Sequence, residues 1–362
     1  MITSSQIEKE LLNFWIDSEN KVSPKKSFQR IYTTNVVVYT SKHLFGHYAE
    51  NSLGELSTRH PGRYILIRPA NDLNTDPVRF FISGHFQIGD KNEKRNCCEI
   101  IKLVSHSPIL NQMYSFASSL LMPDLPLEFW WIGQIPQNDL FFSKMSSIAD
   151  RIWVDSQIFE NPLWDLKNFE LSSRKYNKDI LLGDLNWIRI YRWREIIAEL
   201  FDGAWSRYLL RIKNITIKFG EGFSSFRGLL MACWMAVNLK WNYIGKGIQT
   251  FPEKLEFQSL NREPITVYFQ KVKDSDAMNR LYSVEIETSE PEKAIFQVKR
   301  EKDPQCVLSQ SIVNGEIIFS RTTYFEHLHS SQLLLEGLKR FEPDRVFEKV
   351  LQLIRTMVEL HE

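Results

Sequence analysis

The stretch from Gly220 to Arg227 comes closer to a ligand-binding motif than any other part of this sequence. It follows an expected strand and opens an expected helix, where backbone amides can bind a phosphate. The third glycine of the dinucleotide fingerprint is missing, because a serine occupies its position. A tight turn with a serine capping the helix explains the same residues, and we favour that interpretation. The alternative is an anion site for a sugar phosphate or nucleotide, made by Gly220, Gly222, Ser224, Ser225 and Arg227.

No other set of residues has the spacing of a catalytic or metal centre. His43 and His47 are four residues apart, but no Cys, Asp or Glu at matching spacing completes a metal site. Phosphate-binding loops, nucleophile elbows and zinc-protease helices have no match here. Four acidic residues fall where expected elements begin or end, the usual place of capping carboxylates: Asp124, Asp150, Asp155 and Asp184. We therefore expect no catalytic residue, no metal and no cofactor.

Aromatic residues are unusually frequent, at 13% of the chain. In the densest group two prolines, Pro123 and Pro126, lead into an expected strand that contains Trp130 and Trp131. Successive strand residues point to opposite faces, so one indole is exposed unless helices cover both faces of the sheet. Large rings build cores and also anchor protein interfaces, and the composition is compatible with both roles.

Alternating strands and helices predict an α/β domain over residues 1–165. The strand–helix–strand unit at 35–67 predicts a parallel pair, and hence a mostly parallel sheet. Residues 161–179 are polar and predict an irregular segment, where we place the domain boundary. Helices are expected at 5–17, 44–58, 109–121 and 141–149, and strands at 35–39, 64–67, 78–88, 99–104, 127–132 and 151–154.

Residues 166–362 predict an α+β domain in which helices back an antiparallel meander. Asn314-Gly315 is a strong hairpin signal, because both residues accept positive φ. Pro343 suits the first position of the last helix. Helices are expected at 186–202, 226–241, 331–340 and 343–360, and strands at 210–219, 265–272, 281–287, 294–299, 306–313 and 316–320.

The bulk composition argues against several classes of function. Lys and Arg (45) nearly balance Asp and Glu (44), so no long-range field attracts nucleic acid or an anionic membrane surface. The N-terminus lacks the features of a secretory signal, and the apolar run 229–239 is too short to cross a bilayer. Four cysteines in 362 residues do not make a disulfide framework. We expect a cytoplasmic protein without nucleic-acid or membrane partners.

Several motifs resemble those of the glucose-6-phosphate dehydrogenase assembly protein OpcA family, and the matches keep their order over most of the chain. None of them is a catalytic signature. The motifs are Arg59-His60-Pro61-Gly62-Arg63, the Pro-Asp-Leu-Pro-x-x-x-Trp-Trp run from Pro123 to Trp131, Ala149-Asp150-Arg151-Ile152-x-x-Asp155-Ser156, Asp184-Leu185-Asn186-Trp187-x-Arg189 with Trp193-Arg194-Glu195, and Glu342-Pro343-Asp344-Arg345-Val346-Phe347.

This resemblance implies a non-catalytic partner of glucose-6-phosphate dehydrogenase that promotes the active oligomer of the enzyme or its affinity for substrate. Such an allosteric activator would belong to the oxidative pentose phosphate pathway. The alternatives are an enzyme or sensor that uses the Gly220–Arg227 turn and a scaffold for a different enzyme. Within the matching motifs we expect the partner contacts at Asp124, Trp130, Trp131, Asp150, Arg151, Asp155, Trp187, Arg189, Trp193 and Arg194.

Overall fold

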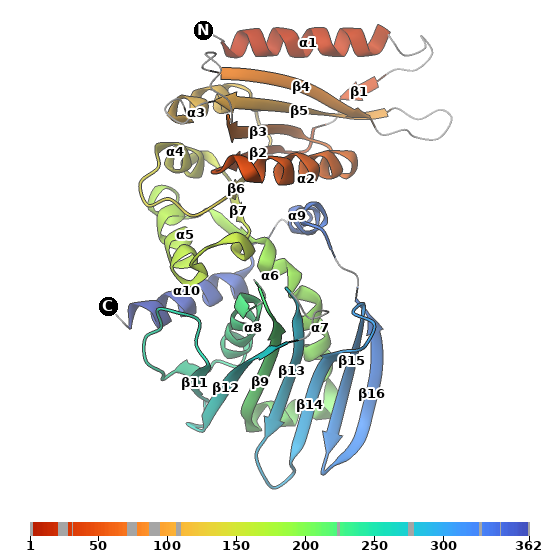
Figure 1. The fold of residues 1–362 in the computed structure, drawn as a ribbon, viewed down its shortest axis with the longest axis vertical. Coiled ribbons are helices and arrows are strands. Elements are labelled where there is room, and N and C mark those ends of the chain that lie inside the picture. Colours follow the sequence, from red (N-terminus) through yellow and green to blue (C-terminus); the bar gives the residue numbers. More distant parts are fainter. Residues whose placement is uncertain are drawn as a thin grey trace. The chain divides into compact units, whose positions relative to one another are not determined.

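A computed structural model describes residues 3–20, 28–30, 32–70, 78–86, 95–105, 110–222, 225–273, 279–325, 328–340 and 342–360 (Figure 1). The chain forms two compact units, each assembled from segments that are far apart in sequence. The contiguous division into 1–165 and 166–362 stays a prediction. Unit 1 comprises Met1–Asp155, Asn168–Asp184 and His329–Pro343, and unit 2 comprises Ser156–Lys167, Leu185–Leu328 and Asp344–Glu362.

Unit 1 is built on sheet A, whose strand order is β1-β5-β3-β2-β6-β7-β8. All neighbours in this order are parallel, and β4 alone pairs antiparallel, with β5. The predicted mostly parallel sheet is therefore confirmed. The strands are β1 (Phe28–Arg30), β2 (Asn35–Thr40), β3 (Arg63–Pro69), β4 (Val78–Phe86), β5 (Arg95–Ser105), β6 (Leu127–Ile132), β7 (Arg151–Val154) and β8 (Leu181–Asp184).

The helices of unit 1 include one contributed by the far end of the chain. Helix α9 (Ser330–Leu338) packs on α2 (Gly46–Arg59), and α3 (Leu110–Ser119) packs on α4 (Leu140–Ile148). Every residue of β2 and β6 is buried, as expected of strands covered on both faces. Helix α1 (Ser4–Asn20) contacts β4.

The prediction of an irregular segment at 161–179 is wrong, because Pro162–Tyr176 forms helix α5. Pro162 stands at the first helical position, Asp165 lies in the first turn, and two basic residues lie in the last turn, which suits the helix dipole. Leu166 and Phe169 lie one turn apart and are buried. The apolar stripe is narrow and is set among polar residues, which hid the helical period.

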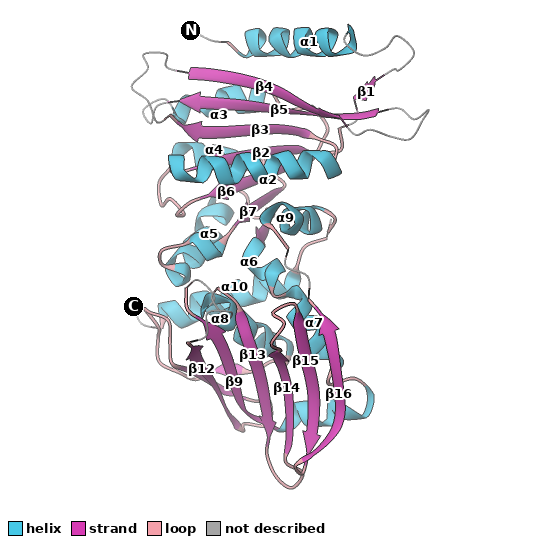
Figure 2. Cartoon of the chain, turned by 45° about the vertical axis from the view of Figure 1, so that its right-hand side comes forward, coloured by secondary structure: helices cyan, strands magenta, loops and turns pink. Residues whose placement is uncertain are grey.

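Unit 2 is built on sheet B, with the order β10-β11-β12-β9-β13-β14-β15-β16. Figure 2 shows the part of this sheet from β12 to β16. The predicted antiparallel meander is confirmed, although β9 and β12 pair in parallel. The strands are β9 (Ile212–Gly220), β10 (Asn242–Tyr243), β11 (Lys254–Gln258), β12 (Pro264–Val272), β13 (Leu281–Thr288), β14 (Ala294–Arg300), β15 (Cys306–Val313) and β16 (Glu316–Tyr324).

Helices back this sheet. The predicted helix at 186–202 is two helices, α6 (Leu185–Arg189) and α7 (Tyr191–Glu199), followed by the 3-10 helix η4 (Gly203–Arg211). Helix α8 (Ser225–Asn238) contacts β9, β12, β13 and α10 (Arg345–Glu359). The last helix begins later than predicted, because the Asp344 carboxylate caps it by accepting a hydrogen bond from Phe347 N (2.9 Å).

Candidate functional site

The strand order of sheet A creates one position at which folds of this type bind ligands. In the run β5-β3-β2-β6-β7-β8, the chain adds β2, β3 and β5 outward on one side and β6, β7 and β8 outward on the other. The strand order therefore reverses between β2 and β6, as in doubly wound dinucleotide-binding sheets. Ligands of such sheets lie at the carboxyl ends of the strands at this switch point. The chemistry of unit 1 therefore depends on the loops that follow Thr40 and Ile132.

These two loops pack directly against each other. No glycine occurs between Thr40 and Phe45, so the loop after β2 lacks the residues that let backbone approach a pyrophosphate. Ser41 N donates a hydrogen bond to Ile132 O (2.9 Å). A Cβ built on Gly133 would lie only 1.8 Å from Ser41 Oγ, so the serine fills the space beside the glycine. The glycine-rich phosphate cradle is absent from this edge of the sheet.

The predicted contact residues beside the switch point are tied into unit 1. Tyr48 Oη lies 3.1 Å from Asp155 Oδ2 and 2.5 Å from Ser330 Oγ, and the Tyr48 ring packs on Trp130. Trp131 stacks on Tyr39 with 4.3 Å between ring centres and donates Nε1–H to Gln134 O (2.9 Å). Both tryptophans and Asp155 are buried.

Asp150 and Arg151 support neighbouring backbone. The Asp150 carboxylate accepts a hydrogen bond from Leu127 N (2.8 Å). Buried Arg151 donates to Gly337 O (3.0 Å) and Arg340 O (2.6 Å), so it binds carbonyl groups at the carboxyl end of α9. Asp124, by contrast, is exposed and has a positive φ of 61° in the turn before β6.

Next to Arg151 lies a buried carboxyl group, Glu128. Burial raises the pKa of Glu128, and this effect is opposed by the charge of Arg151 and by a hydrogen bond from Trp153 Nε1 (2.6 Å). A carboxyl with a raised pKa can mark an acid–base site. Here its indole and guanidinium neighbours are core residues of the sheet, so the geometry is that of a structural cluster.

Three of the four predicted contact residues of unit 2 pack within that unit. Trp187 Nε1 donates to Asp344 Oδ2 (2.8 Å), and the guanidinium of Arg194 lies 3.6 Å from the centre of the Trp187 ring. Trp193 packs on Phe325 (5.6 Å between ring centres). Trp187, Trp193 and Arg194 are buried, whereas Arg189 is half-buried.

The Gly220–Arg227 turn joins β9 to α8, as expected. Arg227 donates hydrogen bonds to Asn186 Oδ1 (2.8 Å), Asn279 O (2.7 Å) and Gln157 Oε1. A Cβ on Gly222, which has φ +93°, would meet Asn279 Oδ1 at 2.1 Å. Ser225 is the first residue of α8, and Ser224 lies outside the described residues. The arginine of the predicted anion site thus already binds three segments of its own unit.

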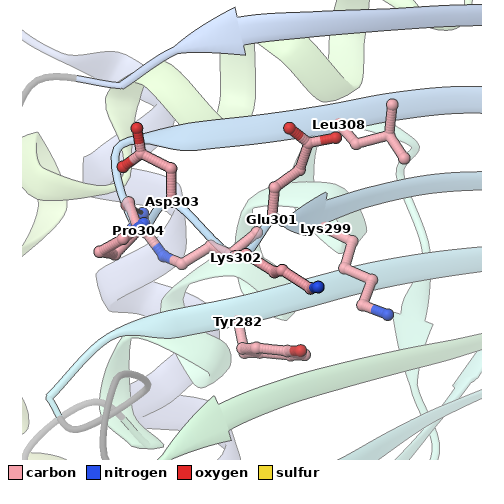
Figure 3. A pocket seen from close by; sticks show the side chains of 8 residues that line it. Tyr282, Lys299, Glu301, Lys302, Asp303, Pro304 and Leu308 are labelled. Carbon is pink, nitrogen blue, oxygen red and sulfur yellow. Dashed lines mark hydrogen bonds between the residues drawn. The ribbon is translucent and has the colours of Figure 1, made fainter.

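Unit 2 also carries a surface cavity of about 810 Å³ on β13–β15 (Figure 3). This cavity was not predicted from the sequence; in the structure, buried and more accessible residues alternate along β14. Its lining carries three basic residues, two lysines and an arginine, and two acidic residues, one Glu and one Asp. The lining residues are Tyr282, Lys299, Arg300, Glu301, Lys302, Asp303, Pro304 and Leu308.

Within the described ranges, no three His, Cys, Asp or Glu side chains lie together so that they could hold a metal ion. His43 lies in a 3-10 turn and His47 in α2, so they do not share one helix. Within the same ranges, every helix is too short or too polar to span a bilayer.

Two family profiles match the chain in tandem. Residues 54–170 match the glucose-6-phosphate dehydrogenase subunit N-terminal domain, and residues 180–351 match the corresponding C-terminal domain. A protein named OxPP cycle protein OpcA from Synechocystis sp. is 25% identical over 272 residues, which is 73% of this chain and 56% of the relative. Its namesake from Nostoc punctiforme is 24% identical over 307 residues, 82% of this chain and 65% of the relative.

This chain therefore spans less than two thirds of the length of these two relatives. Among solved structures, one described as an oxidoreductase from Parabacteroides merdae superposes with a TM-score of 0.53. The sequence identity is 9%, and the match covers 92% of this chain and 98% of that chain. At this identity the similarity concerns the fold alone.

Proposed function

Because this chain belongs to the glucose-6-phosphate dehydrogenase subunit family, whose members include the OpcA proteins, we propose that it is a non-catalytic activator of glucose-6-phosphate dehydrogenase. It binds that enzyme and stabilises its active state in the oxidative pentose phosphate pathway. The observation that carries this proposal is the tandem match, which extends over residues 54–351 with a short gap.

The geometry of the candidate sites supports a role without catalysis. At the switch point of sheet A, Ser41 packs against Gly133 where a dinucleotide-binding fold would present a glycine-rich loop. At the Gly220–Arg227 turn, the guanidinium of Arg227 bonds to Asn186, Asn279 and Gln157. At both of these positions, internal contacts thus take the place of a ligand.

Activation by a binding partner requires differential affinity. A ligand shifts an equilibrium only by as much as its affinities for the two states differ, and a tenfold difference corresponds to about 1.4 kcal/mol. The proposed activator must therefore bind the active form or oligomer of the dehydrogenase more tightly than the inactive one.

Steady-state kinetics of the cognate dehydrogenase, with and without this chain, test the proposal. We expect a higher kcat/KM, or a larger fraction of active oligomer, in the presence of the chain. The proposal fails if the tagged chain never retains the dehydrogenase, or if the chain turns over a substrate alone. A melting temperature raised by sugar phosphates or nucleotides would favour the alternative at the Gly220–Arg227 turn.

Among the predicted contact residues, Asp124 is well placed for a direct test because its side chain is exposed. Asp124→Asn removes the charge and keeps a side chain that tolerates the φ of 61°. If Asp124 contacts the enzyme, we expect about threefold to tenfold weaker retention of the dehydrogenase. Asp179→Asn, at another exposed aspartate, is the matched control. Equal retention by both variants removes Asp124 from the contact set.

A further inference from the structure

Sheet B has helices against only one of its faces within the described part of unit 2. Helix α8 contacts β9, β12 and β13, and α7 contacts β14. The side chains beneath these helices are buried and apolar, for example Ile217, Val284 and Phe296. Side chains along a strand alternate between the two faces of the sheet. The strand residues that alternate with these buried ones therefore form the opposite surface, which we call the open face.

The strand pairing arranges the open face in three rows across six strands. The order within each row is β12, β9, β13, β14, β15, β16. The lysine row is Gln270, Lys218, Ser283, Lys299, Leu308 and Thr322; the amide row is Tyr268, Thr216, Glu285, Gln297, Gln310 and Ser320; the acidic row is Thr266, Asn214, Glu287, Ile295, Ile312 and Ile317.

We propose that the open face is an interface at which two copies of this chain pack face to face, with a twofold axis along the amide row. Rotation about this axis places every strand over the same strand of the other copy, in antiparallel orientation. It also places the lysine row of one copy over the acidic row of the other. Because the same patch serves both copies, the contact closes as a dimer.

Charge complementarity supports this arrangement. The lysine row contains two cations, Lys218 and Lys299, and no acid, whereas the acidic row contains Glu287 and no cation. In the dimer Glu287 lies over Ser283, between the two lysines of the other copy. Asn214 Nδ2 donates to Glu287 Oε2 (3.3 Å) and so holds the carboxylate on this face.

Apolar groups are also matched by the same operation. Ile312 of one copy lies over Leu308 of the other, and Ile295 lies over the aliphatic stem of Lys299. Ile317 is 60% exposed in the single chain. The cavity lined by Tyr282, Lys299 and Leu308 lies at the lysine end of the face, where the isoleucines of the other copy would enter (Figure 3).

The central row is an amide ladder suited to self-contact. Gln297 Nε2 donates to Gln310 Oε1 (2.7 Å), and Gln310 Nε2 lies 3.2 Å from Ser320 Oγ. Amide groups both donate and accept, so they can bond across a twofold axis. Glu285 in the same row faces Glu285 of the other copy, which is an unfavourable contact between like charges. This residue therefore opposes the dimer.

The area is adequate for a specific dimer. The six strands are seven to nine residues long. With strands about 4.8 Å apart and a rise of about 3.3 Å per residue, the face covers roughly 700 Å² in plan. The accessible area of a corrugated surface is larger, and a typical specific interface buries roughly 800 Å² on each partner.

Light scattering and sedimentation of the purified chain alone, up to about 100 µM, test the proposal. We expect the wild-type chain to form a dimer. Lys299→Glu or Glu287→Lys should raise the dissociation constant of this dimer by at least about tenfold, because each variant places like charges together. The double variant should restore the dimer, since the two rows exchange their charges. Glu285→Gln should tighten it. Lys178→Glu, at an exposed lysine of unit 1, is the control that should change nothing.

The proposal is overturned if the wild-type chain is monomeric throughout, if the single variants associate normally, or if the double variant is not rescued. Unchanged circular dichroism shows that the variants remain folded. Variants that keep their oligomeric state but lose the dehydrogenase would assign the open face to the enzyme, which also overturns self-association. The oligomeric state is measured without the dehydrogenase, so a monomeric wild-type chain leaves the proposed activator function standing.

Discussion

Arg194 shows at the scale of one residue how unit 2 uses its charged side chains. Its guanidinium lies 3.6 Å from the centre of the Trp187 ring, and the Trp187 indole bonds to Asp344. A largely desolvated cation on an aromatic face contributes about 2 kcal/mol. The three residues belong to α7, α6 and the cap of α10. Replacing Arg194 therefore perturbs the folding of unit 2, whether or not it touches a partner.

His60, the residue that directly follows α2, gives a prediction about pH. Burial lowers the pKa of His60 below its usual value of 6.5, because the neutral imidazole is favoured in the folded chain. The unfolded chain then binds the proton at a higher pH than the folded chain does. We expect the free energy of unfolding to fall as pH drops below about 6.5, and to be unaffected by this group at higher pH.

Denaturant titrations of the wild type and of His60→Gln, at several pH values between about 5 and 8, check this expectation. The variant should lose part of the decline in stability below about pH 6.5. His47→Gln, at an exposed histidine of α2, should keep the wild-type dependence. Parallel curves for the wild type and His60→Gln would contradict the assignment.

At the scale of elements, Trp153 of sheet A packs closely against α9. A Cβ built on Gly337 of α9 would lie 2.2 Å from the Trp153 ring, and one built on Gly183 of β8 would lie 2.3 Å from it. The indole thus lies between two glycines that leave room for it. Arg151 then bonds to the carbonyls of Gly337 and Arg340.

A pair of glycine substitutions tests this packing. Gly337→Ala introduces a methyl group where the Trp153 ring lies, and we expect it to lower the free energy of unfolding by about 1–3 kcal/mol. Gly54→Ala lies in helix α2 of the same unit, where the nearest atom is His85 Cε1 at 3.7 Å. That change should stabilise the protein by about 0.5–1 kcal/mol, because alanine favours a helix. Similar denaturation midpoints for the two variants would refute the proposed role of Gly337.

The elements that could be predicted from the sequence are those with a strong local pattern. The apolar runs Val36–Val38 and Ile65–Ile67 became β2 and β3, and Asn314-Gly315 became the β15–β16 hairpin. Helix α5 was missed because its apolar residues are few. The partners of α9 could not be predicted, since residues far apart in sequence, Glu55 and Ser331, form its contacts.

The candidate site illustrates the same limit. Trp130 and Trp131 were correctly predicted on opposite faces of one strand. Only the packing of Tyr48 of α2 on Trp130 and of Phe142 of α4 on Trp131 shows that both faces are covered. The rows of the open face depend on the register between strands. Register is a tertiary property, so the match of Lys299 with Leu308 is not visible in either strand alone.

At the scale of the whole molecule, each unit is completed by a late segment of the chain. Unit 1 takes His329–Pro343, and unit 2 takes Asp344–Glu362. The change from one unit to the other occurs at the Asp344 cap of α10. Neither compact unit is therefore encoded by a single continuous segment.

This organisation predicts that a fragment of residues 1–184 is incomplete without residues 329–343. In the fragment, buried Arg151 loses two carbonyl partners, and Tyr48 and Glu55 lose Ser330 and Ser331. Of these three residues Arg151 is buried, and an unsatisfied buried group costs about 1–3 kcal/mol. Joining 329–343 to the fragment through a flexible linker should raise its Tm by at least about 10 °C. The control is a fusion of equal length that carries Leu333→Asp and Leu334→Asp, which places charges at two buried positions of α9. If the fragment, the fusion and the control melt together, α9 is not needed to complete unit 1.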